Sequence, residues 1–299
     1  MLIDSRYKGI IFMLLAALGF SIMGGAAKSL KESFGAGQLV FWRNAIGLLA
    51  LVPGILLKPP VQAGGKLTRL IFRGVMGTLA LYTLLYCILH LPLGTAMSYN
   101  LTSVLFIALF SFLFFKEYHG KKVLFAVLLG FTGMLLIYKP IMHFPWFYHV
   151  AGIISGISAA IAYLTLGRLA GYYDPRIIVL SFLLCGFLIP LITMFVHYTT
   201  GVAADGLFVI NWRWPYGAEW VAIFILGLAA LFGQYFVTKA YGVDKAGIVS
   251  VFGYANIVYS VFIGMGLGDD FPDWMSSLGI ISIISSGVII SLVKRKKSG

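Results

Sequence analysis

Arg43 lies inside a long apolar segment, where a charge is costly unless it faces a cavity or a partner. Its planar guanidinium has the geometry to hold a carboxylate or a phosphate through paired hydrogen bonds. The alternative is that the side chain extends to the nearest interface, because Arg43 is close to the start of its segment. Both interpretations are open. Arg73 lies nearer the basic end of its segment, and the interfacial interpretation is favoured for it.

Amide and phenol side chains also fall within apolar segments. Thr78, Tyr82 and Tyr86 recur every four residues, which predicts one face of a helix. Because such groups are costly in apolar surroundings, we expect them to point inward. There they either bind a solute or join neighbouring helices by hydrogen bonds. The candidate solute-binding residues are Arg43, Tyr82, Tyr86, Tyr99, Asn100, Tyr163, Gln234, Tyr254 and Asn256.

The acidic residues show a different pattern, because all 10 lie outside the apolar segments or at their ends. Proton-coupled carriers commonly use a buried carboxylate with a shifted pKa, and no histidine replaces it here. We therefore expect exchange, facilitated diffusion or coupling through substrate charge rather than proton symport. Glu117 and Asp269 are predicted to be structural, each accepting hydrogen bonds from turn amides or contacting a basic residue. No catalytic residue, cofactor or metal site is expected.

The composition places these residues in a membrane. Hydrophobic residues make up 60% of the chain, charged residues only 11%, and the mean hydropathy is +0.96. Such a chain cannot supply the polar surface of a soluble domain. Apolar runs of about 20 residues are long enough to cross a bilayer as helices. The predicted spans are residues 7–28, 38–57, 70–89, 94–115, 122–139, 149–170, 177–197, 218–239, 246–267 and 274–293.

The basic residues predict the orientation. Most of the 22 Lys and Arg residues fall in the connections that share a side with the N-terminus. The positive-inside rule then predicts a multi-pass protein of the cytoplasmic (inner) membrane with both termini in the cytoplasm. Since these charges are scattered between apolar segments, the net charge of +12 does not indicate a nucleic-acid partner. The expected partners are a small-molecule substrate and the lipid bilayer, with the protein a monomer or weak homodimer.

The two halves of the chain share a pattern. An ungapped register that sets Leu93 opposite Lys245 also sets Tyr82 opposite Gln234 and Glu117 opposite Asp269. In both regions small residues precede a long apolar segment, an acid ends it, and a glycine-containing segment follows. We predict two five-helix repeats, residues 1–145 and 146–299. Because five is odd, the second repeat is inverted, an arrangement typical of transporters whose substrate site lies at the repeat interface.

Several stretches resemble a known family. "FWRN" opens the second span, "GTAMSYNLTSVLFIALFSFLFFKE" forms the fourth, and "QYFVTKAYGVDKAGIVSVFGYANIVYSVFIGMGLGDD" covers the eighth and ninth. Over essentially its whole length the chain resembles the drug/metabolite transporter superfamily, in its EamA-like branch. The resemblance implies an all-α membrane protein of ten transmembrane helices, arranged as two inverted-topology repeats around a central cavity. Gly268-Asp-Asp270 stands where the family usually has Gly-Glu, so the longer glutamate side chain has no special role at that position.

The predicted function is secondary transport of a small organic solute by alternating access, with export or exchange favoured. The solute is expected to be an amino acid or related metabolite with an anionic or aromatic group. The alternatives are a membrane channel and a membrane-embedded enzyme. An enzyme needs a nucleophile with its base, or metal ligands, at one depth, and neither G-x-S-x-G nor H-E-x-x-H occurs. A channel more often has a filter or charged ring built by several subunits, and its flux does not saturate.

Overall fold

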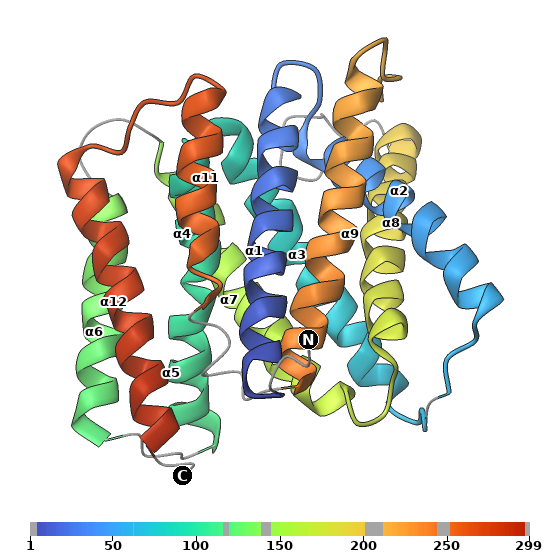
Figure 1. The fold of residues 1–299 in the computed structure, drawn as a ribbon. Helices are drawn as coiled ribbons and strands as arrows, with labels where there is room; N and C mark the ends of the chain where they lie inside the picture. Colours follow the sequence, from blue (N-terminus) through green and yellow to red (C-terminus); the bar gives the residue numbers. More distant parts are fainter. Residues whose placement is uncertain are drawn as a thin grey trace.

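The structure, a computed structural model, describes residues 5–61, 63–115, 120–138, 145–200, 212–243 and 252–296. Within these ranges the chain is helical, and the helices stand side by side (Figure 1). The helices are α1 (Ser5–Ser29), α2 (Ala36–Leu57), α3 (Leu67–His90), α4 (Leu93–Leu101), α5 (Ser103–Phe115), α6 (Gly120–Tyr138), α7 (Trp146–Leu169), α8 (Pro175–Thr200), α9 (Glu219–Val243), α11 (Ala255–Gly266) and α12 (Trp274–Lys296).

Long apolar runs explain this architecture. In lipid every backbone N–H and C=O group needs a partner within the protein, and a helix provides one within each segment. Six helices, α1, α2, α3, α7, α8 and α9, are each long and apolar enough to cross a membrane. Shorter apolar helices cover Leu93–Ile107, Ala255–Gly266 and Trp274–Ser286. The predicted total of ten spans stays a prediction.

The predicted fourth span is wrong in one respect, because it is not one continuous helix. α4 ends at Leu101 and α5 begins at Ser103. At the break the Thr102 hydroxyl donates to Tyr99 O (2.6 Å), and the Thr102 backbone N–H donates to both Ser98 O (3.2 Å) and Tyr99 O (3.1 Å). A side chain that binds the preceding turn commonly bends a helix. The predicted ninth span began at residue 246, but residues 244–251 lie outside the described part.

Close helix pairs cross between the two halves of the chain. α1 packs on α9, α3 packs on α7, and α6 packs on α12 at one edge of the molecule (Figure 1). At the α1–α9 contact, a Cβ on Gly19 would lie 2.9 Å from both Ala229 O and Gly233 N. Only glycine allows backbones to approach this closely, as is usual where membrane helices pack.

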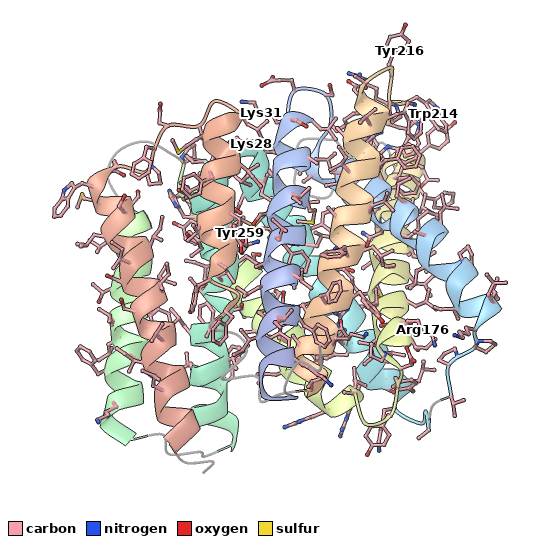
Figure 2. The ribbon with its side chains drawn as sticks, in the orientation of Figure 1. Lys28, Lys31, Arg176, Trp214, Tyr216 and Tyr259 are labelled. Carbon is pink, nitrogen blue, oxygen red and sulfur yellow. The ribbon has the colours of Figure 1, made fainter. Side chains whose placement is uncertain are left out.

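The two ends of the molecule carry different side chains. Lys28, Lys31, Trp214 and Tyr216 lie at one end, and Arg176 lies near the other (Figure 2). α1 begins and α12 ends at the Arg176 end (Figure 1). The chain therefore enters and leaves the helical bundle on the same side.

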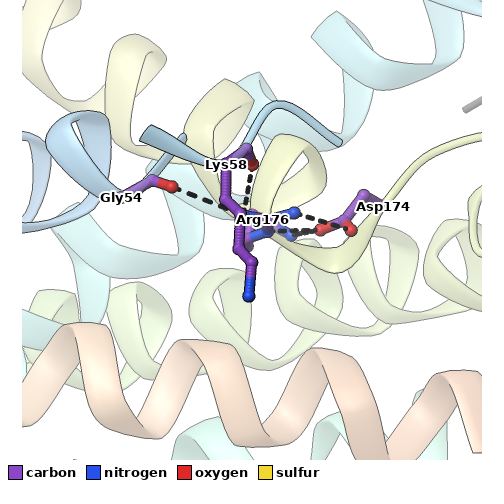
Figure 3. Close-up of polar contacts among 4 residues, drawn as sticks. All are labelled: Gly54, Lys58, Asp174 and Arg176. Carbon is purple, nitrogen blue, oxygen red and sulfur yellow. Dashed lines mark hydrogen bonds and ion pairs between the residues drawn. The ribbon is translucent and has the colours of Figure 1, made fainter. Parts of the chain in front are cut away.

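Arg176 joins α8 to the end of α2 (Figure 3). Its Nη1 donates to Lys58 O (2.8 Å), and its Nε pairs with Asp174 Oδ1 (3.1 Å). Carbonyls at a helix C-terminus lack hydrogen-bond donors within the helix. The Arg176 guanidinium supplies such a donor to the Lys58 carbonyl at the end of α2. Partial burial raises the pKa of the Asp174 carboxyl, but hydrogen bonds from Arg176 outweigh this and bring the pKa below its ordinary value.

Candidate solute-binding site

A cavity lies among the central helices. Its walls come from α1 to α5 in the first half of the chain and from α7, α8, α9 and α11 in the second, while no described side chain of α6 or α12 lines it. Apolar side chains such as Phe20, Met23 and Leu84 form much of the wall. A mostly apolar pocket with a few polar groups is the usual form of a small-molecule site.

Two arginines line this cavity. Arg43 on α2 and Arg73 on α3 are 1% and 2% exposed, and their Cζ atoms lie 4.8 and 4.9 Å from the centroid of the same Phe182 ring. The interfacial interpretation favoured for Arg73 is wrong, because its side chain turns into the cavity. For Arg43 the structure selects the cavity over the interface. Arg43 Nη1 donates to Asn44 Oδ1 (2.8 Å).

Both guanidiniums keep hydrogen-bond donors without partners. Nε of Arg43, and Nε and Nη1 of Arg73, are buried and bond to no atom of the described residues. Nor does any carboxylate in the described ranges form an ion pair with either arginine. A buried charge without a counter-charge is strongly unfavourable. Within the described part of the chain, the positive charge of the two guanidiniums therefore has no acidic counter-charge.

Three predicted amides reach the cavity. Asn100 Nδ2 donates to Ser155 Oγ (2.9 Å), and Asn256 Nδ2 donates to Ala17 O and Ser21 Oγ (3.0 Å each). These two side chains therefore also join helices, which was the alternative weighed for all such residues. Gln234 differs, since its Nε2 is buried and has no partner among the described residues.

The predicted tyrosines separate into two groups. Tyr163 lines the cavity and stacks on Tyr241 (ring centroids 5.2 Å apart). The other four are not lining residues. Tyr99 OH bonds to His149 Nδ1 (2.7 Å), and Tyr86 lies against the ring of Tyr148. Tyr82 and Tyr254 are buried in the hydrophobic core, as is Tyr99.

Asp269 joins three helices. It forms an ion pair with Lys28 in the last turn of α1, and its Oδ2 accepts from the backbone N–H of Leu93 at the start of α4 (2.8 Å). Lys28 Nζ also donates to Leu91 O (3.0 Å). Asp269 follows α11, so these contacts hold the ends of α1, α4 and α11 together. Glu117, the second predicted structural acid, lies outside the described residues.

Arg73 is the site residue that the sequence interpretation missed. On α3 the cavity face consists of Arg73, Gly77, Ala80, Leu81 and Leu84, which repeat with helical spacing. The helix face predicted from the sequence consists of Thr78, Tyr82 and Tyr86, and it lies next to this cavity face. The sequence did contain a pattern that predicts this face, because Arg73 recurs at helical spacing with a glycine and with small or aliphatic residues.

Comparison with known proteins decides the family. The profile of the EamA-like transporter family matches residues 7–139. An uncharacterized transporter of Helicobacter pylori is 33% identical over 293 residues, which cover 95% of this chain and 94% of the relative. The chain belongs to the EamA-like transporter family. As a member with six long apolar helices in its described ranges, it is a multi-pass membrane protein of the drug/metabolite transporter superfamily.

Two further similarities extend along the chain. The pseudopaline exporter CntI of Pseudomonas aeruginosa is 30% identical over 301 residues, covering 99% of this chain and all of the relative. A solved crystal structure superposes with a TM-score of 0.68 at 17% identity and covers 96% of this chain and 98% of the other. That structure shows the shared fold alone. The names of these sequence relatives are those of transporters, and nothing in them points to catalysis.

Proposed function

We propose that this EamA-like protein is a secondary transporter that moves a small organic anion, such as an amino acid or related metabolite, across the cytoplasmic membrane by alternating access. The observation that carries the proposal is the cavity between the two halves of the chain, to which Arg43 and Gln234 present donors that have no partner among the described residues. A carboxylate is the natural partner for a buried guanidinium, because the two planar groups match in geometry and charge.

Two inverted repeats, residues 1–145 and 146–299, are part of this proposal. If α1, α2, α3, α5 and α6 correspond to α7, α8, α9, α11 and α12, exchanging the halves converts the α1–α9 contact into α7–α3. It likewise converts α2–α9 into α8–α3 and α1–α11 into α7–α5, and all of these contacts occur. α2 begins at the Lys28 end and α8 at the Arg176 end (Figures 1 and 2). This pattern supports an inverted relation and a substrate site where the repeats meet.

Export or exchange is proposed rather than proton symport. Among the described residues that line the cavity there is no Asp, Glu or His. A cavity with fixed positive charge binds an anion at either membrane face, so a second anion can drive the return step. The exporter among the relatives supports the outward direction.

Counterflow in proteoliposomes tests the proposal. The purified protein should exchange at least one radiolabelled amino acid or organic acid in a saturable manner, whereas a channel would give flux that does not saturate. Arg43→Ala should raise the KM at least tenfold, because a hydrogen bond to a charged group contributes about 1.5–3 kcal/mol. Gln234→Ala should raise it less. Arg69→Ala, an exposed change on α3, is the control. Unchanged affinity in both cavity variants would contradict the assigned site.

A further inference from the structure

We infer that the solute carries two negative charges, held between Arg43 and Arg73. The inference rests on the proposed transport function and narrows its substrate class to small organic dianions. Either two carboxylates or one phosphate monoester supplies this chemistry. A buried arginine is costly within a membrane-spanning helix, and this cavity contains two of them. A ligand that pairs with both arginines would account for both charges.

The first step concerns charge. Arg43 and Arg73 come from different helices, α2 and α3, yet their side chains lie against one ring in one cavity. No carboxylate within the described ranges pairs with either of them. A monoanion neutralises only one guanidinium and leaves the other as an unpaired buried charge, whereas a dianion neutralises both.

The second step concerns the orientation of the donors. Phe182 has both guanidinium carbons over its ring, within 5 Å of the centroid. A guanidinium that lies over a ring uses its face for that contact and keeps the N–H groups at its edge available. The buried Nε of Arg43 and the buried Nε and Nη1 of Arg73 are such groups, and they bond to no described atom.

The third step concerns the rest of the solute. Gln234 Nε2, on α9, is a further lining donor without a described partner, and Asn100 lines the cavity from α4. The remaining wall is largely apolar, with Phe20, Met23 and Leu84. The site therefore fits a short carbon skeleton with polar groups, and its donor-rich lining favours acceptors over donors on the solute.

Binding measurements on the purified protein use matched probes. Succinate is compared with succinamate, glutarate with glutaramate, and glycerol 3-phosphate with its monoanionic methyl phosphodiester. At neutral pH we expect at least one dianionic headgroup to bind tenfold or more tightly than its less charged partner. The carboxylate pairs and the phosphate pair distinguish the two sources of charge. If no dianion binds more tightly than its partner, the inference is wrong. If a partner compound still shows saturable counterflow, the transport proposal stands without it.

Variants tie the preference to the arginines. Arg43→Gln and Arg73→Gln should each reduce the preference for the dianion to less than threefold, while Arg69→Gln, exposed on the same helix as Arg73, should leave it unchanged. Folding is checked by size exclusion and thermal unfolding. An unchanged preference in either folded cavity variant would overturn the assignment.

A final comparison needs no substrate. Phe182→Glu places a carboxylate near both guanidiniums, and Phe182→Gln is its uncharged match. If the cavity requires negative charge, the Glu variant should have a Tm several degrees above the Gln variant, and the difference should shrink when Arg73→Gln is added. Equal Tm values, or a lower Tm for Glu, would show that the arginines need no counter-charge.

Discussion

Gly77 sets the position of the Phe182 ring beside the two arginines. A Cβ at this position would lie 2.9 Å from Phe182 Cδ2 and 3.8 Å from Arg73 Nη1. Gly77→Ala therefore has to displace the ring, and overpacking of this kind costs about 1–3 kcal/mol. We expect solute affinity in proteoliposomes to fall about tenfold. Gly54→Ala, also in a helix but with nothing within 4 Å of the added Cβ, is the control. Equal affinities in the two variants would contradict the role given to the ring.

At this scale the sequence predicts part of the site. Arg43, Gln234 and Tyr163 could be selected because a polar group inside an apolar segment must face something other than lipid, and the structure places them at the cavity. The same argument cannot separate a cavity from a helix contact. Tyr99 shows this, since it satisfies its hydroxyl with His149. Partners of this kind depend on how helices distant in sequence are rotated about their axes.

The ion pair between Lys28 and Asp269 acts at the scale of helices. It joins α1, α4 and α11, each of which contributes lining residues, and we expect it to close the cavity toward the Lys28 end of the molecule. Both side chains are largely buried, at 9% and 14% exposed. Breaking one partner of a buried pair costs about 3–5 kcal/mol, so this contact favours the state in which that end is closed.

Asp269→Asn should therefore open the Lys28 end. The readout is the maleimide labelling rate of a cysteine at Met23, a buried lining residue, in a background without Cys87 and Cys185. We expect the rate to rise about tenfold or more, which corresponds to about 1.4 kcal/mol. Glu32→Gln, which removes an exposed ion pair with Lys31, is the matched control. Equal rates in both variants would show that the contact does not close the cavity.

The bounds of most helices could be predicted from apolar run lengths, because hydrophobic thickness fixes how many residues a span needs. The break at Thr102 could not. It depends on a side-chain hydrogen bond to Tyr99 O and on the close approach of α7, where a Cβ on Gly156 would lie 2.9 Å from that same oxygen. Contacts between helices that are distant in sequence therefore decide where a long apolar segment is interrupted.

For the whole molecule, the distribution of charge predicts which end faces the cytoplasm. We expect the Arg176 end, where α1 begins and α12 ends, to be cytoplasmic. In right-side-out vesicles of a cysteine-free background, a membrane-impermeant maleimide should label Tyr216→Cys directly. It should label Lys58→Cys, near Arg176 (Figure 3), only after permeabilisation. The reverse pattern would show that the opposite end is cytoplasmic.

The contact at Gly19 determines which parts of the protein can tilt as rigid bodies. With the backbones of α1 and α9 touching near Gly233, no layer of side chains remains along which the two helices can slide. We expect them to move together as one rigid pair, although one comes from each half of the chain. α3 and α7 also pack together across the two halves. Each of these helix pairs combines one helix from residues 1–145 with one from residues 146–299, so a polypeptide containing only one of these halves would lack both pairs.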